Sequence, residues 1–252
     1  MTEVRSGKVY FASDFHLGIP DRASSLERER RIIRWLDSIE HDAETIYLVG
    51  DLFDAWFEYK RVVPKGFVRL LARIASFTDR GIPVHVFTGN HDMWMFGYLE
   101  DECGVQLHHE PIKTTIAGKK FLIAHGDGLG PGDHRYKFIK RIFRSRFLQW
   151  LYARIHPNTG IGLADFFSRK GYDKKDGERN WLGDDKEFLM QFCRETLQHE
   201  HIDYFIFGHR HLPIDKEVGT NSRYINLGDW ITFNTYAEFD GQNLALKTFN
   251  EV

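Results

Sequence analysis

Polar side chains recur at the ends of short apolar runs, and this feature constrains the fold of the chain more than any other. The runs are short and rich in β-branched or aromatic residues, as buried strands are. They are Lys8–Ser13, Thr45–Val49, Val84–Thr88, Phe121–Ala124 and Tyr204–Phe207. Ligands of open α/β sheets bind at the carboxyl ends of the strands. We therefore expect polar side chains from distant parts of the sequence to meet at one edge of the fold.

The polar groups at these strand ends are carboxylates, imidazoles and one amide. In chain order they are Asp14, His16, Asp51, Asp54, Asn90, His91, Asp92, His125, His209 and His211. Each motif alone is weak, because DxH or GD after a strand is common in turns and caps. Burying all of them would cost several kcal/mol for each uncompensated charge. A cluster of cations is the natural compensator.

These side chains predict a dinuclear metal site. Nitrogen and oxygen ligands without sulfur suit Mn, Fe or Zn and disfavour soft metals. We expect two divalent ions, with Mn first and Fe, Zn or Co as alternatives that the residues do not separate. Asp51 is the best candidate for a bridging carboxylate. The expected ligands are Asp14, His16 and His211 in one site and Asn90, His125 and His209 in the other. Such a pair activates water for attack on phosphorus and neutralises phosphate charge.

Helical patterns lie between the strands. One spans Leu26–Ile39, with Ser24 and Ser25 as caps. A second is expected to open at Pro64 and stop at Gly81. A third is expected to begin at Asp184, with Glu187 completing a capping box.

The end of the chain reads as strands again. The expected strands are Tyr224–Leu227, Ile231–Phe239 and Leu244–Phe249. Alternating strands and helices followed by a strand-rich end predict an α/β protein with mixed sheets.

Size and composition favour one domain carrying an insertion. The 252 residues are 42% hydrophobic and have a formal net charge of -2, so any attraction for an anion must be local. Cys103 and Cys193 form no CxxC pair, which fits a reducing cytosol. The N-terminal apolar run is too short for a signal peptide, and no apolar span of about 20 residues follows. We expect a cytoplasmic protein that is neither secreted nor transmembrane.

The segment between Gly126 and Leu182 breaks the strand pattern and predicts a helical insertion over residues 127–182 of a domain spanning 1–252. One long basic amphipathic helix is expected at Arg135–Ile155, where seven Lys or Arg residues alternate with large apolar ones and no acid is present. Such a helix suits contact with anionic lipid at the inner membrane, or a lid over an acylated phosphate substrate. The alternative is a helix packed on the domain with a solvated basic face.

The ordered motifs D-x-H, G-D-x-x-D, G-N-H-D, H-G-D and G-H-x-H resemble those of the calcineurin-like metallophosphoesterase family. The resemblance implies a four-layer αββα sandwich of two mixed sheets, with both metals at the sheet edges. It also implies that His91 supports the leaving oxygen and that Asp92 orients the His91 ring.

Longer stretches resemble one branch of that family, the UDP-2,3-diacylglucosamine hydrolases of lipid A synthesis. They are YLVGDLFDAWFEY, AHGDGLGPGDHRY, FGHRHLPIDKEV and YINLGDW. The resemblance implies cleavage of the pyrophosphate of UDP-2,3-diacylglucosamine by water, giving UMP and 2,3-diacylglucosamine 1-phosphate. It implies that the insertion cradles the acyl chains. The substrate contacts it implies are Asn90, His91, Asp133, Ser168, Lys175 and His209, with Arg169, Lys170 or Lys174 as substitutes for the weaker matches at Ser168 and Lys175.

One departure keeps other functions open. The best-known members of that branch carry Arg where this chain has His91, and a His can transfer a proton as well as bear charge. A phosphodiesterase or phosphatase for a soluble nucleotide or other phosphate ester is the alternative enzyme, and a noncatalytic scaffold is the alternative of another class. Nucleic acid is not expected as a partner, because duplex binding needs an extended basic footprint. Oligomeric state does not follow from the sequence.

Overall fold

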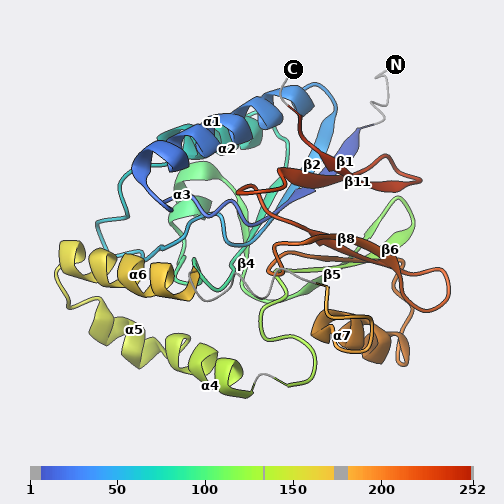
Figure 1. Cartoon of the computed structure of the whole chain (residues 1–252). Coiled ribbons are helices and arrows are strands. Elements are labelled where there is room, and N and C mark those ends of the chain that lie inside the picture. Colours follow the sequence, from blue (N-terminus) through green and yellow to red (C-terminus); the bar gives the residue numbers. More distant parts are fainter. Residues whose placement is uncertain (1–6, 133, 173–180, 251–252) are drawn as a thin grey trace.

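Two mixed β-sheets face each other in the computed structural model, which describes residues 7–132, 134–172 and 181–250 (Figure 1). The strand orders are β11-β10-β1-β2-β3-β4 and β5-β6-β7-β9-β8. The first sheet contains β1 (Lys8–Ala12), β2 (Ala43–Val49), β3 (Val84–Phe87), β4 (Gln106–His108), β10 (Thr235–Phe239) and β11 (Leu244–Thr248). The second contains β5 (Ile112–Ile116), β6 (Lys119–Ala124), β7 (Tyr204–Phe207), β8 (Pro213–Glu217) and β9 (Arg223–Leu227). In each sheet the central strands are parallel and the additional antiparallel pairs make it mixed.

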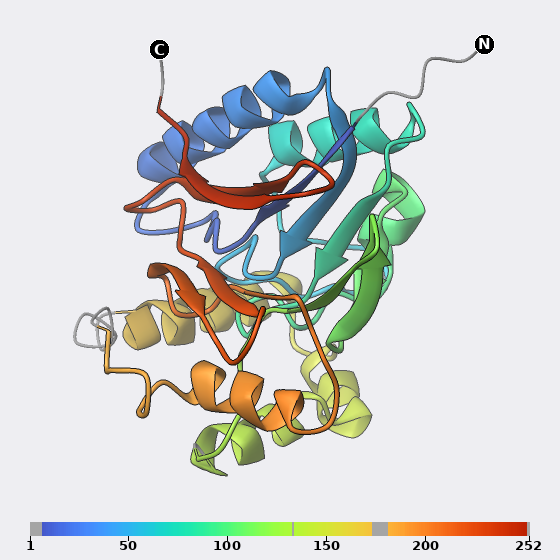
Figure 2. The same cartoon turned by 90° about the vertical axis from the view of Figure 1, so that its right-hand side faces the viewer.

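Helices cover both outer faces of this pair of sheets, as the two views show (Figures 1 and 2). The first sheet carries α1 (Arg22–Ile39), α2 (Val68–Thr78) and α3 (Tyr98–Cys103), and the second carries α7 (Phe188–Leu197). Three further helices lie to one side of the sandwich, namely α4 (His134–Phe143), α5 (Arg146–Tyr152) and α6 (Pro157–Tyr172). We call α4, α5 and α6 the cap. The expected four-layer αββα architecture is confirmed.

Strand β1 shows why the sequence produces these layers. Successive side chains of a strand point to opposite faces. Tyr10 and Ala12 pack among the residues of α1 and α2, whereas Val9 and Phe11 face the second sheet. The ring of Phe11 lies 5.8 Å from that of Phe121 on β6. Both faces of the strand are therefore apolar, as the continuous apolar run predicts.

Three helices begin at different residues from those predicted, and one of them, α7, begins at Phe188 rather than Asp184. Helix α1 begins at Arg22 because the side chain of Asp21 accepts hydrogen bonds from the N–H groups of Ala23 and Ser24, so the predicted serine caps are wrong. The hydroxyl of Ser25 instead accepts from the N–H of Gly18. Helix α2 begins at Val68 rather than Pro64.

The predicted capping box of α7 is also wrong, because Glu187 is used elsewhere. Its carboxylate is fully buried and accepts hydrogen bonds from Arg210 Nε at 3.0 Å and Nη2 at 2.8 Å. It also accepts from the N–H of Leu182 at 3.2 Å. The Glu187 carboxylate is therefore used in a long-range ion pair and not in a capping box. The ion pair fixes Arg210, which stands between His209 and His211 in the sequence.

The expected single helix Arg135–Ile155 is two helices, since α4 ends at Phe143 and α5 begins at Arg146. The expected strand Ile231–Phe239 begins only at Thr235, because the carboxylate of Asp229 accepts from three successive N–H groups and holds a turn there.

The bounds of the insertion and its role as a lid stay predictions. Among the described residues, no helix has the length and apolar character needed to cross a bilayer.

Removing the negative charge of Glu187 should destabilise the fold. In the Glu187→Gln variant the buried Arg210 loses its counter-charge, so we expect the free energy of unfolding to fall by about 3 kcal/mol. Chemical denaturation measures this change. The matched variant Glu195→Gln removes an exposed charge from the same helix and should change stability by less than about 0.5 kcal/mol. Equal stability of the two variants would contradict the role given to the ion pair.

Candidate metal centre

The loops that follow β1, β2, β6 and β7 are joined by backbone hydrogen bonds at one edge of the sandwich. The N–H groups of Asp14 and His16 donate to the carbonyl oxygens of Gly50 and Asp51 at 3.0 and 2.9 Å. The N–H of Gly208 donates to the carbonyl of His125 at 2.9 Å, which ties the corresponding loops of the second sheet. The N–H of His209 donates to Asp14 Oδ2 at 3.0 Å, so the strand ends of both sheets form one rim.

This rim brings six of the seven predicted ligands into two groups. In each group every residue offers a ligand atom, and these atoms lie within 4.8 Å of one another. The first group is Asp14, His16, Asp51 and His211, and the second is Asp51, His125 and His209. The seventh, Asn90, places Oδ1 3.4 Å from His125 Nε2. Asp51 belongs to both groups, as a bridging ligand would.

The two carboxylate oxygens of Asp51 have different surroundings. Oδ1 accepts a hydrogen bond from the N–H of His91 at 2.8 Å. Oδ2 is buried and makes no hydrogen bond within the described part of the chain, although it lies 3.6 Å from His16 Nε2 and 3.2 Å from His125 Nε2. A buried polar atom without a hydrogen bond calls for a partner. The arrangement fits an oxygen shared by two cations.

Three histidines at the rim direct Nδ1 at an oxygen of the protein, through hydrogen bonds for His16 and His125 and at ion-pair distance for His211. His125 Nδ1 lies 2.9 Å from the carbonyl of Val49, His16 Nδ1 3.2 Å from Asp54, and His211 Nδ1 3.4 Å from Asp229. In each case Nε2 is turned toward the carboxylates of the rim. Metal-ligating histidines are oriented in this way by an oxygen on the other ring nitrogen.

Asp229 was not among the sequence-predicted site residues, and Asp54 was noted only as a strand-end group. A signal for Asp229 exists, because Leu227-Gly228-Asp229 repeats the apolar-Gly-Asp pattern found at Val49-Gly50-Asp51. Asp54 is the last residue of the G-D-x-x-D motif and contacts both His16 and His91.

The backbone of the ligands is itself unusual. Five of them have positive φ, which is uncommon for residues other than glycine. The angles are 56° at Asp14, 43° at His16, 52° at Asp51, 68° at His209 and 51° at His211. Such strain persists only where the surrounding structure enforces it, and it is frequent at functional sites.

Glycines allow the loops to come this close. A Cβ on Gly89 would overlap the carboxylate of Asp51, and a Cβ on Gly208 would overlap that of Asp14. The close approach of these loops therefore requires glycine at these two positions.

In the metal-free site the buried carboxylates favour protonation of the groups beside them. Burial lowers the pKa of His16, but the carboxylates of Asp14 and Asp54 outweigh it and raise that pKa to about 9. Burial likewise opposes the charged form of His125, yet Asp51 raises its pKa to about 10. Burial and the charge of Asp51 raise the pKa of Asp92 to about 7. The carboxylates therefore hold protons on their neighbours, and bound cations would replace those protons.

The remaining predicted residues have different locations. Asp92 accepts from the N–H groups of Leu52 and Gly89, each at 2.7 Å, so its carboxylate joins two loops. His91 Nδ1 contacts Asp54 rather than Asp92, with the carbonyl oxygen of Asp54 at 3.0 Å. The predicted contact Ser168 does reach the rim, with its Oγ 2.9 Å from His91 Nδ1. Asp133 and Lys175 lie outside the described residues.

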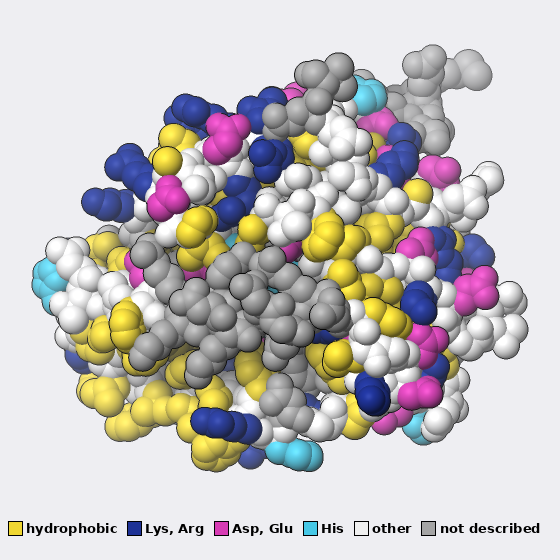
Figure 3. Space-filling model, in the orientation of Figure 1, with side chains coloured by type: hydrophobic (Ala, Val, Ile, Leu, Met, Phe, Trp, Pro, Cys, Tyr) yellow, Lys and Arg dark blue, Asp and Glu magenta, His cyan; other side chains and the backbone are white. Residues whose placement is uncertain are grey.

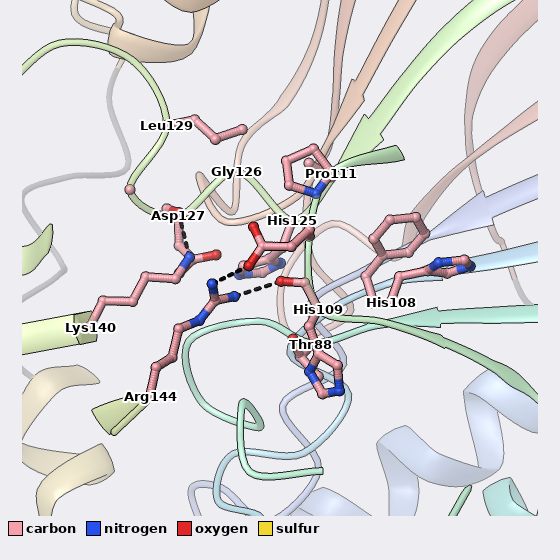
Figure 4. A pocket seen from close by; sticks show the side chains of 14 residues that line it. Thr88, His108, His109, Pro111, His125, Gly126, Asp127, Leu129, Lys140 and Arg144 are labelled. Carbon is pink, nitrogen blue, oxygen red and sulfur yellow. Dashed lines mark hydrogen bonds and ion pairs between the residues drawn. The ribbon is translucent and has the colours of Figure 1, made fainter. Parts of the chain in front are cut away.

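A cavity of about 230 Å³ opens beside His125, between the rim and α4 (Figure 4). Lys140 reaches across it to Asp127, with Nζ 2.5 Å from Oδ2. Arg144 donates to Glu110 and to the carbonyl of His109, each at 2.5 Å. Two cationic side chains, one on α4 and one directly after it, thus line a hollow next to a predicted metal ligand.

The two-sheet sandwich and the shared carboxylate define a metal-dependent phosphoesterase. The calcineurin-like phosphoesterase family model matches residues 7–213, and the chain belongs to this family of hydrolases. It is 40% identical to a UDP-2,3-diacylglucosamine hydrolase of Porphyromonas gingivalis over 260 residues, which cover 97% of this chain and 98% of the relative.

A second UDP-2,3-diacylglucosamine hydrolase, from Actinobacillus succinogenes, is 26% identical over 243 residues, covering 95% of this chain and 99% of the relative. Among solved structures, the phosphoesterase Yfce from E. coli aligns with a TM-score of 0.47 at 14% identity, covering 96% of this chain and all of its own.

Removing the shared carboxylate should affect both groups of ligands. The wild-type chain should bind about two Mn²⁺ ions. We expect Asp51→Asn to bind fewer than about one ion, whereas His211→Ala, which alters only the first group, should keep about one. Metal analysis after dialysis measures both. Asp101→Asn, which changes an exposed acid on α3, should bind as the wild type does.

Thermal unfolding of the metal-free Asp51→Asn variant shows whether this variant folds. Without metal, Asp51→Asn should have a lower thermal midpoint than the wild type, because the neighbouring imidazoles lose the negative charge with which, against the effect of burial, they hold the pKa of Asp51 low and that of His125 high. Stabilisation by added Mn²⁺ should be largely lost. Two ions bound to Asp51→Asn would contradict a shared ligand.

Proposed function

We propose that this chain hydrolyses the pyrophosphate bond of UDP-2,3-diacylglucosamine to UMP and 2,3-diacylglucosamine 1-phosphate. The observation that carries the proposal is a cap with exposed apolar side chains in direct contact with a phosphoesterase metal centre. The near-complete alignment with relatives of that name supports the same substrate. A soluble nucleotide would not need the exposed apolar surface of the cap.

We assign seven side chains to the metal ions, with Mn²⁺ as the expected metal. They are Asp14, His16, Asp51, Asn90, His125, His209 and His211. When bound, the two ions supply Lewis-acid activation of water and neutralise charge on the phosphate. Their fit to this site rests on the buried Oδ2 of Asp51, which lies between the two groups of imidazoles.

The protein side chains align the reaction and assist the leaving group. Water attacks the α-phosphorus, and the bond from that phosphorus to the bridging oxygen breaks. The leaving oxygen belongs to the acylated sugar 1-phosphate, and we assign its stabilisation to Nε2 of His91, whose Nδ1 is held by Asp54. Asp92 acts indirectly by fixing the loops of Asp51 and His91. Asn90 and His209, together with Asp133 and Lys175, stay proposed substrate contacts.

The cap offers an apolar surface for acyl chains. Among its exposed side chains are Phe138, Phe147, Trp150, Leu151, Phe166 and Phe167. In the space-filling view, hydrophobic side chains gather over the cap, with Lys and Arg beside them (Figure 3). Exposed apolar patches of this kind mark ligand-binding or membrane-contact sites. We propose that the cap receives the acyl chains and touches the cytoplasmic face of the inner membrane, where anionic lipid would meet its basic residues.

The substrate assignment predicts release of UMP. The Mn²⁺-loaded protein should convert UDP-2,3-diacylglucosamine to UMP far faster than it hydrolyses bis-p-nitrophenyl phosphate, because only the first substrate uses the cap. Chromatography of the nucleotide products measures the rate. The matched substrate is UDP-N-acetylglucosamine, which has the same pyrophosphate without long acyl chains and should react slowly. Turnover of the generic ester alone would favour a phosphodiesterase or phosphatase.

Polar substitution on the cap should weaken lipid contact. Phe147 and Trp150 are 68% and 54% exposed and stack on each other with ring centroids 6.1 Å apart. The double variant Phe147→Ser/Trp150→Ser should bind anionic vesicles at least about tenfold less well, since two aromatic side chains no longer enter the lipid. Vesicle flotation measures binding. Val68→Ser removes an equally exposed apolar group from α2, away from the cap, and should float as the wild type does. Equal binding by all three proteins would contradict the proposed contact between the cap and the membrane.

A further inference from the structure

One hydroxyl of the cap contacts the groups that surround the metal centre. Ser168 on α6 donates from Oγ to Asp54 Oδ2 at 2.6 Å. The same Oγ lies 2.9 Å from His91 Nδ1. Asp54 and His91 come from the loops after β2 and β3, so this contact joins the cap to the rim of the first sheet.

The hydrogen-bond directions follow from the donors and acceptors that are present. Asp54 Oδ2 accepts from Ser168 Oγ at 2.6 Å, and an ionised carboxylate has no proton of its own to donate. Ser168 therefore gives its single proton to Asp54, and its oxygen lone pairs face the His91 ring. The carbonyl of Asp54, 3.0 Å from the same Nδ1, also can only accept. Both neighbours thus require Nδ1 of His91 to carry the proton.

Asp54 links this arrangement to a predicted metal ligand. Its other carboxylate oxygen, Oδ1, lies 3.2 Å from His16 Nδ1 and 3.4 Å from His91 Nδ1. With only 3% of its surface exposed, Asp54 cannot exchange these partners for water. The side chain of Ser168 thus lies on a carboxylate that already holds two imidazoles in place.

We propose that Ser168 is a positioning residue, which together with Asp54 holds the His91 ring with Nδ1 as donor and Nε2 toward the leaving oxygen. The inference rests on the proposed phosphoesterase function of the site. The expectation that Ser168 contacts the substrate stays a separate prediction. Because α6 also carries the exposed Phe166 and Phe167, the helix that would meet acyl chains is the helix that orients His91.

The first test is a double-variant cycle on small aryl phosphodiesters that are too short to need the cap. With the Mn²⁺-loaded enzyme, Ser168→Ala should lower kcat about tenfold, with little change in KM, because His91 loses part of its orientation. Ser168→Thr keeps the hydroxyl and should restore most of the rate. In a His91→Ala background, Ser168→Ala should have no further effect. The loss should be larger for diphenyl phosphate than for bis-p-nitrophenyl phosphate, because phenolate is the poorer leaving group and needs His91 more.

A second readout does not depend on turnover. Nitrogen-15 NMR of histidine side chains in the metal-free protein should show Nδ1 of His91 protonated in the wild type, with His91→Ala identifying the signal. Ser168→Ala should shift that signal, and Thr159→Ala, which removes an exposed hydroxyl from the same helix, should not.

Three results would overturn the proposal: independent losses in the double variant, an effect of Ser168→Ala only on KM for the acylated sugar nucleotide, or a His91 protonated at Nε2 alone. Failure of the proposed function is distinct, because the wild-type enzyme would then release no UMP from the acylated substrate whatever the cycle shows.

Discussion

The carboxylate of Asp51 is the point on which the site depends. It is fully buried, its Oδ1 is fixed by the backbone of His91, and its Oδ2 lies between His16 and His125. Such a group is costly in an apolar interior unless opposite charge surrounds it. The sandwich meets this need by bringing loops of both sheets together, with the ligand backbone held in the left-handed region. The metal centre therefore depends on the fold, because the packed apolar layers hold the ligand loops in their strained backbone conformation.

Much of the fold and of the candidate site could be predicted because the sequence patterns that specify them are local. A run such as Val9 to Ala12 is apolar on both faces, and a polar residue follows it directly. The α/β class with mixed sheets and the convergence of the ligands follow from such patterns, whereas the four layers were implied by the family resemblance. What the sequence did not predict depends on contacts between distant residues. Glu187 has the spacing of a capping box, yet Arg210, 23 residues away, claims its carboxylate. The contact of His91 with Asp54 rather than Asp92 likewise depends on how two loops pack.

We propose that the cap makes a general phosphoesterase centre selective for its substrate. Its contacts with the sandwich include Trp94, whose indole N–H donates to the carbonyl of Phe143, and Ser168, which reaches Asp54. Between these anchors, large apolar side chains remain exposed and basic ones line the hollow beside His125. This combination suits a substrate with an anionic pyrophosphate at one end and acyl chains at the other. In such a site the orientation of His91 would depend on α6, the helix that would meet the acyl chains, because Ser168 on that helix contacts the His91 ring.

The central claim is that Asp51 joins two cation sites, and anomalous X-ray diffraction from crystals grown with Mn²⁺ tests it most directly. The account predicts two manganese peaks on either side of the Asp51 carboxylate, one beside Asp14, His16 and His211 and the other beside Asn90, His125 and His209. A single peak, or manganese bound away from Asp51, would contradict it.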